Sequence, residues 1–257
     1  MRVIQKLAFL CFVSTILLNG AVSYSCELVI YGNHQKPPKY YLYKNTPTGI
    51  LVDIMKYAEQ ETNCSFDIQL YPWKRAYIKA LKGNGGIIGL SKNTERLKIF
   101  DYSDVMFYDD LLLVVLKGNE FDYKNIEDLK GKTLGAQRGG SFGDEFERGK
   151  AGIFKVIEDD GQISRLRRLL KGRIDVALIG PGRIGLDMVI AQDQLLSKSK
   201  EQFVVLSKPF KRDPNFLGFK KTMNMSGFIK KFNKAIEQCR KSGECQKIVD
   251  SYSVLDL

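Results

Sequence analysis

Hydrophobic and polar positions alternate between strand-like and helix-like patterns along the first part of this chain. The segment Leu28–Tyr31 is rich in β-branched and aromatic residues, and 49–62 carries its apolar residues on one helical face. Three further elements follow in alternation, a strand at 65–71, a helix at 74–82 and a buried strand at 87–90. This order predicts an open sheet with helices on its faces, and such sheets bind ligands beyond the carboxyl ends of their strands.

A second alternating series follows a long apolar strand at 111–116. Its predicted elements are strands at 133–136, 154–157 and 175–179, a turn at 137–141, and helices from 143, at 161–170 and from 181. The last part of the chain predicts strands at 203–206 and 216–220 and two helices separated by Gly243. The pattern as a whole is α/β, with two open sheets that helices cover.

The first C-terminal helix carries one apolar face, formed by Phe228, Phe232, Ala235, Ile236 and Cys239. No other sheet remains for this face to cover, so we expect the helix to return to the first series. The chain then crosses twice between two lobes, and two crossing strands make a hinge. The predicted lobes are 26–109 together with 213–257, and 110–212.

Residues 1–25 have the three-part layout of a secretory signal peptide. Arg2 and Lys6 come first, an apolar run at 7–18 follows, and small residues end the segment. The run is too short to span a bilayer as a stable helix. No second long apolar segment follows, so we expect an exported, soluble protein.

The end of the predicted signal peptide allows two cleavage points, after Ser23 or after Ser25, since small residues precede both. A lipid anchor at Cys26 is the disfavoured alternative. Ser23 and Tyr24 occupy positions where a lipoprotein signal would have small and aliphatic residues. We therefore expect a chain that is released rather than anchored.

Five cysteines are present, and Cys11 lies within the predicted signal peptide. The even number that remains in an oxidising compartment predicts two disulfides. Cys26 opens one predicted strand and Cys64 precedes the next, so the two sulfurs meet if these strands are parallel neighbours. Cys239 and Cys245 flank a predicted turn. We predict the pairs 26–64 and 239–245. Free thiols or zinc are the alternatives, but the spacings match no common zinc pattern.

The formal charge of the chain is +11, and the two positive charges of the signal peptide, which has no acids, leave +9 on the rest. Such a balance favours anionic partners. The basic residues are scattered among acids and accompany no recognition motif, so we expect no nucleic-acid partner. A solvated basic surface is the favoured interpretation.

A candidate anion site follows the buried strand at 87–90, where a polar turn leads to an arginine. Ser91 and Arg96 come just after this strand, so a hydroxyl and a guanidinium fork can converge on a small carboxylate. The alternative is a surface Arg96 that pairs with Glu95 or Asp101.

Five sets of short motifs occur along the chain: Thr48-Gly49-Ile50-Leu51-Val52-Asp53, Glu95-Arg96 before Phe100-Asp101-Tyr102-Ser103-Asp104, Asp128-Leu129-Lys130-Gly131-Lys132, Arg138-Gly139-Gly140-Ser141, and Gly172-Arg173-Ile174-Asp175. Their order and spacing resemble the family-3 solute-binding proteins of bacterial ABC transporters, a group that includes periplasmic glutamine- and histidine-binding proteins. The resemblance covers nearly all of the chain after the signal peptide. It implies the two-lobed type II periplasmic binding protein fold, with a solute trapped between the lobes.

The resemblance also implies roles for individual residues. Ser91, Arg96 and the backbone of Gly89 match positions that hold the α-carboxylate of the ligand. Ser141 and the amides of Gly139–Gly140 match a second-lobe turn that meets the same carboxylate at a helix N-terminus, and free amides at such an end favour an anion. A simple helix cap is the alternative role for Ser141.

Aromatic residues complete the implied site. Trp73 matches a position where a ring packs over the ligand, although a lone tryptophan is also a common core residue. Asn33 occupies a position where members of the family often carry an acid. Tyr31 and Tyr40 lie near it in the sequence and are further candidates.

One departure from the family pattern concerns the ammonium group of the ligand. Amino-acid binders of this family usually have an aspartate at the position of Gly180, and a buried ammonium without a carboxylate partner is costly. Glu158, Asp159 or Asp160 could replace that aspartate. Arg183 could serve a second acidic group of a dicarboxylate, although a solvated Arg183 is the favoured interpretation. The sequence leaves the identity of the ligand open.

Three functions fit the resemblance. The first is a periplasmic receptor that traps a small anionic or zwitterionic solute and presents it to an ABC permease. The second is a dehydratase-like enzyme. His34 is the single histidine, so it is the one imidazole available for catalysis, and a histidine-rich metal site is excluded. The third is a freestanding ligand sensor. We predict the receptor, as a monomer that is no enzyme and needs no cofactor or metal.

Overall fold

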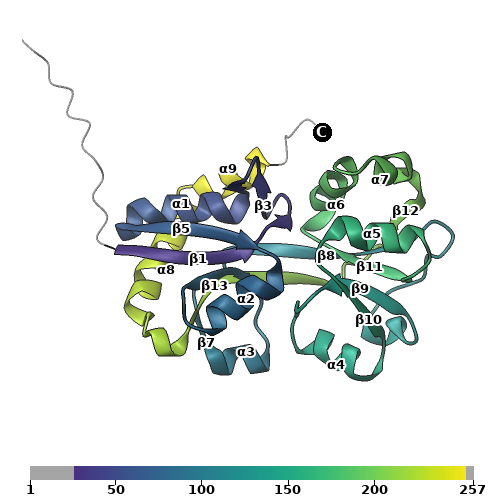
Figure 1. Ribbon diagram of the computed structural model, residues 1–257, viewed down its shortest axis with the longest axis horizontal. Helices are drawn as coiled ribbons and strands as arrows, with labels where there is room; N and C mark the ends of the chain where they lie inside the picture. Colours follow the sequence, from purple (N-terminus) through teal and green to yellow (C-terminus); the bar gives the residue numbers. More distant parts are fainter. Residues whose placement is uncertain (1–25, 253–257) are drawn as a thin grey trace, which may run out of the picture.

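The structure, a computed structural model, describes residues 26–252. The first lobe contains the parallel strands β1 (Cys26–Asn33), β5 (Cys64–Tyr71) and β6 (Gly86–Leu90), with β1 between the other two. The crossover helices are α1 (Ile50–Thr62) and α2 (Trp73–Leu81). They pack on opposite faces of these strands, so each face of the sheet is covered (Figure 1). The predicted βαβαβ unit is confirmed.

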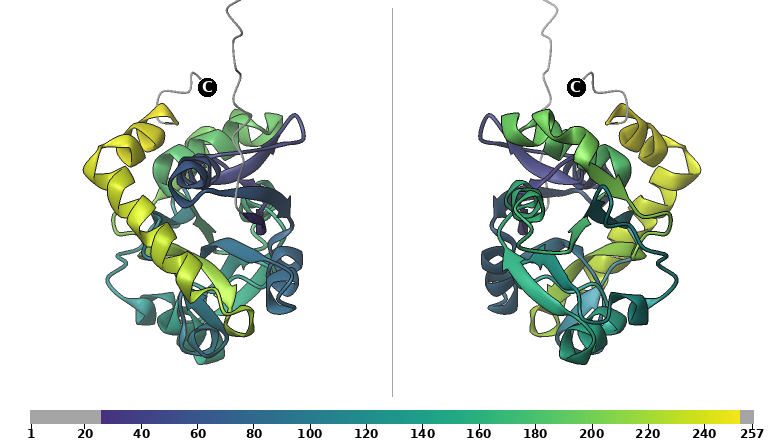
Figure 2. Two further views of the ribbon diagram at one scale, coloured as in Figure 1. Left: turned by 90° about the vertical axis from the view of Figure 1, so that its left-hand side faces the viewer. Right: turned by 90° about the vertical axis from the view of Figure 1, so that its right-hand side faces the viewer.

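A short helix and a short strand follow β6, namely α3 (Thr94–Ile99) and β7 (Phe100–Tyr102). The C-terminal segment adds η3 (Lys221–Met223), α8 (Ser226–Lys241) and α9 (Glu244–Ser251). Figure 2 shows α8 and α9 running along the outside of the first lobe. Phe232, Ala235 and Ile236 of α8 are buried in one core with Leu51 and Met55 of α1. The predicted return of the C-terminal helices to the first lobe is therefore confirmed.

The second lobe is built around three parallel strands, with β9 between β10 and β11. Its elements are η1 (Ile126–Leu129), β9 (Thr133–Gln137), α4 (Asp144–Gly152), β10 (Lys155–Asp159), α5 (Gln162–Leu170), β11 (Val176–Ile179), α6 (Gly182–Ala191), α7 (Gln194–Lys198), η2 (Lys200–Gln202) and β12 (Phe203–Val205). Two hydrophobic clusters lie on the two faces of these strands. This lobe is the second α/β series that the periodicity predicts.

Two long strands join the lobes, β8 (Phe107–Leu116) and β13 (Lys211–Lys220). They pair antiparallel, with Asp213 opposite Asp109, and the sheet order is β10-β9-β11-β8-β13-β6-β1-β5, with β12 beside β8 and β7 beside β13. Both strands begin earlier than the sequence predicts. The added segments 107–110 and 211–215 are charged and show no strand periodicity, and their pairing with each other satisfies their backbone groups.

A small sheet has no counterpart in the sequence prediction. It consists of β2 (Gln35–Lys36), β3 (Tyr40–Tyr43) and β4 (Thr46–Thr48), in antiparallel order. The segment contains three prolines, of which Pro37 and Pro38 are joined by a cis peptide bond, and it is too short and too polar to show a periodic pattern. It places Lys36 and Lys39 at the edge of the first lobe that faces the second.

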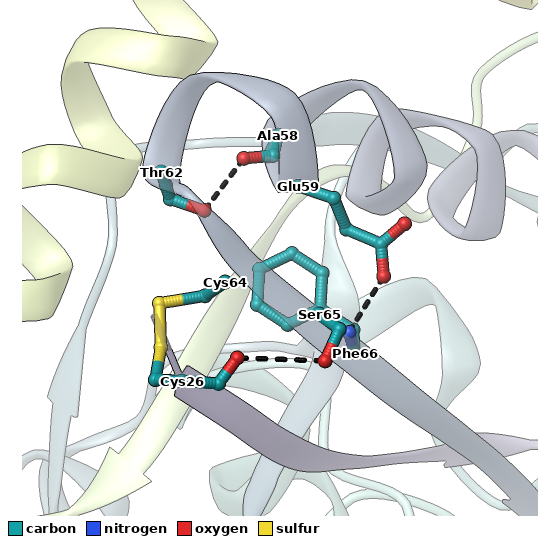
Figure 3. Close-up of a disulfide and its surroundings, with 7 residues drawn as sticks. All are labelled: Cys26, Ala58, Glu59, Thr62, Cys64, Ser65 and Phe66. Carbon is teal, nitrogen blue, oxygen red and sulfur yellow. Dashed lines mark hydrogen bonds between the residues drawn. A yellow bond between two sulfur atoms is a disulfide. The ribbon is translucent and has the colours of Figure 1, made fainter. Parts of the chain in front are cut away.

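Both predicted disulfides are present. Cys26 and Cys64 begin β1 and β5, and they are paired in the parallel register, with their Cα atoms 4.7 Å apart (Figure 3). Cys239 and Cys245 link α8 to α9 across 5.1 Å between their Cα atoms. The first pair was predictable because two parallel neighbours that start at cysteines bring the sulfurs to one edge.

Contacts around the Cys26–Cys64 bond hold the start of β5 in place (Figure 3). The Phe66 amide donates to Glu59 Oε1 at 2.6 Å, and Ser65 Oγ lies 3.4 Å from the Cys26 carbonyl oxygen. These contacts join the end of α1 to both bonded strands.

The predicted signal peptide, with its cleavage points, lies outside the described residues. Within residues 26–252, no helix has the length and apolar character needed to cross a membrane. Over the same range, no three His, Cys, Asp or Glu side chains gather into a group that could hold a metal ion.

Candidate functional site

A cavity of about 40 Å³ lies between the two lobes, at the carboxyl ends of their strands. Six predicted site residues line it: Asn33, Trp73, Gly89, Ser91, Gly140 and Ser141. Tyr40, a further candidate from the sequence, also lines it. Its position agrees with the general rule for open α/β sheets, because the loops after the strands of both lobes meet there.

The strand β6 carries Gly89 to the cavity lining, and Ser91 lies there directly after the strand ends. Gly89 has φ +73°, and a Cβ atom there would lie 2.4 Å from the ring of Tyr40, so a side chain is excluded. Burial raises the pKa of the Tyr40 hydroxyl above its ordinary value, which keeps the ring neutral. Ser91 is buried and its hydroxyl donates to Asp213 Oδ2 in β13. Sequence reasoning missed Asp213 because the charged segment at 211–215 shows no strand pattern.

Arg96 lies beside the cavity rather than in its lining. Asn93 caps α3 by accepting a hydrogen bond from the Arg96 amide at 2.7 Å, which orients the residue toward the second lobe. Its guanidinium donates to the Ser91 carbonyl at 3.1 Å and lies 3.5 Å from the Gly139 carbonyl. Only 4% of the residue is exposed.

The surface alternative for Arg96 is wrong. Glu95 pairs with Lys98 at 2.7 Å, and no carboxylate in residues 26–252 forms an ion pair with Arg96. The guanidinium instead faces the rings of Tyr77 and Trp73, with its central carbon 5.0 Å and 6.0 Å from their centroids. Arg96 is thus a buried cation whose protein partners are neutral.

Trp73 is both a core residue and a wall of the cavity. Its ring is buried in the cluster beneath α2, and its Nε1 donates to the Gly139 carbonyl at 3.1 Å. Tyr31, by contrast, does not line the cavity. Its hydroxyl donates to the Asn84 carbonyl at 3.2 Å, and its ring packs within the same core. Tyr31 thus lies in the core that it shares with Trp73 and outside the cavity lining.

Hydrogen bonds join the two lobes at the cavity. Asn33 Nδ2 donates to Gln137 Oε1 at 3.2 Å, and Asn93 Nδ2 donates to Ser141 Oγ at 2.8 Å. The helix-cap alternative for Ser141 is wrong, because Gly143 is the N-cap of α4 and no side chain caps that helix. These contacts hold the lobes in a closed arrangement.

Two lysines that the sequence analysis did not select line another wall of the cavity. Lys36 Nζ and Lys39 Nζ lie 2.5 Å and 2.8 Å from the same oxygen, Asp109 Oδ2. Lys39 also donates to Asn215 Oδ1. Burial alone would raise the pKa of Asp109, but the two ammonium groups outweigh it and hold that pKa at about 2. The only signal in the sequence is a pair of lysines around Pro37 and Pro38.

Gly180, where the family pattern has an aspartate, lies against Asp109. A Cβ atom on Gly180 would be 2.2 Å from Asp109 Oδ1, so the carboxylate of β8 fills the space that a side chain at Gly180 would need. The three acids proposed as replacements are engaged elsewhere and do not line the cavity. Asp159 binds Arg165, Asp160 binds Arg138, and Glu158 Oε1 lies 3.4 Å from the Gly139 amide. Arg183 is exposed, as favoured.

A model of the family described as bacterial extracellular solute-binding proteins, family 3, matches residues 28–254. The chain belongs to this family. Membership confirms the resemblance seen in the motifs, and it confirms the prediction of a solute-binding protein rather than an enzyme.

Relatives of the chain include two curated proteins and a crystal structure. The L-cystine-binding protein TcyJ of Escherichia coli (strain K12) is 27% identical over 163 residues, which are 63% of this chain and 57% of that protein. The chain thus matches little more than half the length of this relative. The arginine-binding extracellular protein ArtP of Bacillus subtilis (strain 168) is 26% identical over 239 residues, 90% of this chain and 87% of that protein.

The crystal structure is of a mutant of ArgBP from T. maritima. It has a TM-score of 0.71 and 21% sequence identity, and the match covers 88% of this chain and 94% of that chain. At this identity the likeness establishes the fold alone. It confirms the predicted two-lobed architecture.

Proposed function

We propose that the protein is a periplasmic receptor that traps a small carboxylate-bearing, amino-acid-like solute between its lobes for an ABC-type importer. The observation that carries the proposal is Arg96, a buried guanidinium at the edge of the cavity whose partners in the described part of the chain are carbonyl oxygens and aromatic rings. A buried cation of this kind favours an anion as its ligand, because the anion supplies the missing opposite charge. The names of TcyJ and ArtP, an L-cystine-binding and an arginine-binding protein, support an amino-acid-like solute.

The proposed carboxylate site is shared between the lobes. Arg96 and Ser91 belong to the first lobe, and the turn at Gly139–Gly140 with Ser141 belongs to the second. The turn precedes α4, whose uncapped N-terminus presents backbone amides that favour negative charge. A carboxylate that contacts both sides binds the closed form better than the open form, so binding favours closure.

We also propose that the lobes divide within the joining strands. The boundaries 109/110 and 212/213 fall inside the paired segment of β8 and β13, where a change in backbone angles would move one lobe against the other. In this proposal the protein acts as a monomer, and the two lobes together form the surface that the permease contacts.

The proposed location is the periplasm. The family consists of extracellular proteins, and two disulfides fit an oxidising compartment. Since the Cys26 sulfur is bonded to Cys64, it is not available for a lipid in this bonded state. This bond supports the expectation of a released protein.

The substitution Arg96→Ala tests the proposed carboxylate site. We expect amino acids and small dicarboxylates to raise the melting temperature of the native protein, and we expect the variant to lose this shift because the solute loses its buried counter-charge. Differential scanning fluorimetry measures the shift. Arg183→Ala is the matched control, because Arg183 is an exposed arginine that does not line the cavity. A ligand-induced shift that survives in Arg96→Ala would remove Arg96 from the site.

A further inference from the structure

Two lysines at the cavity, Lys36 and Lys39, carry more positive charge than one neighbouring carboxylate can neutralise. Lys36 and Lys39 share a single carboxylate, Asp109, whose Oδ2 lies within 2.8 Å of both ammonium groups. Lys39 is 2% exposed and the Lys36 side chain is 15% exposed, so water screens this charge poorly. One positive charge is therefore left over at this wall of the cavity.

The ammonium group of Lys36 also has unused hydrogen-bond donors. Each ammonium group has three donors. Lys36 uses one of them on Asp109, and within residues 26–252 it has no second acceptor. Burial lowers the pKa of Lys36, and Asp109 offsets part of that effect. An anion in the cavity would satisfy the remaining donors and stabilise the charged form.

The other charged groups of the lining are already balanced. Arg165 donates to both oxygens of Asp159, at 2.9 Å and 2.7 Å, and to the Leu178 carbonyl. Asp213 has Lys211 Nζ 3.0 Å from its Oδ1. Among residues 26–252, Arg96 and the lysine pair are thus the groups near the cavity that lack a full counter-charge, and together they leave two positive charges.

These two groups are close enough for one short molecule to contact both. Asp109 and Asp213 are directly opposite in the antiparallel pair of β8 and β13, where opposite side chains lie about 5 Å apart. Asp109 holds the lysines, and Asp213 accepts a hydrogen bond from Ser91, whose carbonyl binds Arg96.

We propose that Lys36 and Lys39 form a second anion subsite, so that the solute carries two acidic groups, one at Arg96 and one at the lysine pair. This inference rests on the proposed function. Two kinds of solute share the required chemistry, short dicarboxylates and acidic amino acids. Asp213 is the carboxylate of the described cavity lining, and the ammonium group of an amino acid would have to share its Oδ1 with Lys211 Nζ, which lies 3.0 Å away, whereas a dicarboxylate makes no such demand.

Calorimetric titration with matched solutes tests the second subsite. The pairs are L-glutamate with L-glutamine, L-aspartate with L-asparagine, and succinate with succinamate, since each pair differs in one charge at nearly constant shape. We expect the native protein to bind the acidic member of at least one pair about tenfold or more tightly than its amide, as for a hydrogen-bonded ion pair. Equal binding of both members in every pair, or tighter binding of the amides, would overturn the proposal.

The variant Lys36→Gln tests whether the lysine pair causes the preference for the acidic solute over its amide. It leaves Lys39 with Asp109, so the buried carboxylate keeps a partner and the fold is preserved. We expect the variant to lose the preference for the acidic solute, while its affinity for the amide changes by about twofold at most. Lys117→Gln, at an exposed lysine remote from the cavity, is the control. A preference that persists in Lys36→Gln would contradict the subsite.

The results separate the two proposals. If no carboxylate-bearing solute binds, the proposed function itself fails. If solutes bind in an Arg96-dependent way but the second acidic group adds nothing, only the lysine subsite is wrong. Tighter binding of aspartate or glutamate than of succinate or glutarate identifies an acidic amino acid as the solute, and the reverse order identifies a dicarboxylate.

Discussion

At the scale of single residues, Asp109 connects the hinge to the cavity. Its Oδ2 binds Lys36 and Lys39, while its Oδ1 fills the space beside Gly180. It also lies opposite Asp213 in the hinge, and like charges at this position would be unfavourable without the lysines. The carboxylate therefore stabilises the fold at neutral pH and orients the proposed subsite.

Replacement of this carboxylate, Asp109→Asn, is expected to destabilise the protein by about 3–5 kcal/mol at neutral pH, because two buried ammonium groups lose their counter-charge. The folded-state pKa of Asp109, about 2, is below the ordinary value of 3.8. The stability from its ionised form is thus complete above about pH 4 and is lost as the pH falls through 2. Urea unfolding at pH 7 and between pH 5 and 2 measures both effects.

The exposed pair of Asp122 with Lys124 offers a control for this prediction. Asp122→Asn removes a carboxylate that is open to solvent, so we expect little change in the free energy of unfolding. A difference between Asp109→Asn and the native protein that stays constant from pH 7 to pH 2 would contradict the linkage.

At the scale of elements, the disulfides join the ends of neighbouring elements over loops of different length. The Cys26–Cys64 bond closes a sequence separation of 38 residues and holds β1 to β5 at their starts. The Cys239–Cys245 bond closes a separation of 6 residues at the turn between α8 and α9. A cross-link restricts the unfolded chain more when it closes a longer loop.

Removal of the two bonds should therefore have unequal effects. Loop-closure entropy predicts a loss of about 4 kcal/mol for Cys26→Ser with Cys64→Ser, and about 2 kcal/mol for Cys239→Ser with Cys245→Ser. Urea unfolding under non-reducing conditions measures both losses, and the native protein in reductant provides the comparison. Equal losses, or a larger loss for the shorter loop, would show that loop length does not govern these bonds.

At the scale of the whole molecule, the lobes are held closed by contacts outside the cavity as well as around it. The Thr94 amide and hydroxyl donate to the two oxygens of Asp144 at 2.9 Å and 2.8 Å. These atoms are exposed and belong to α3 in the first lobe and α4 in the second. They add to the bonds that Trp73 and Asn93 make across the gap.

Loss of this outer contact in Asp144→Ala should shift the lobes toward an open form. We expect a larger radius of gyration in the absence of solute, from small-angle X-ray scattering, and a solute affinity lower by up to about tenfold, since the competent closed form is less populated. Glu145→Ala, exposed on the same helix, is the control. Unchanged scattering would mean that the outer contact does not contribute to closure.

Much of the fold was predictable from the sequence by itself, because hydrophobic periodicity reports which face of an element is buried. The apolar face with Phe232 and Ile236 predicted that α8 packs on the first lobe, and it does. Cys26 and Cys64 stand at the starts of two predicted strands, and the pairing of these strands as parallel neighbours brings the two sulfurs together. The turn after β6 and the motifs around Arg96 and Ser141 also indicated the family and its cavity.

Only the tertiary structure decided which charged groups meet. Lys39, Asp109 and Asn215 come from segments separated by at least 70 residues, and their meeting depends on how β8 and β13 pair and on a small sheet that shows no periodicity. Packing also decided the position of Tyr31, whose hydroxyl donates to the Asn84 carbonyl and whose ring lies in the core instead of the cavity. Local pattern determines the face that a residue occupies, but the packing of distant segments determines the partner that it finds there.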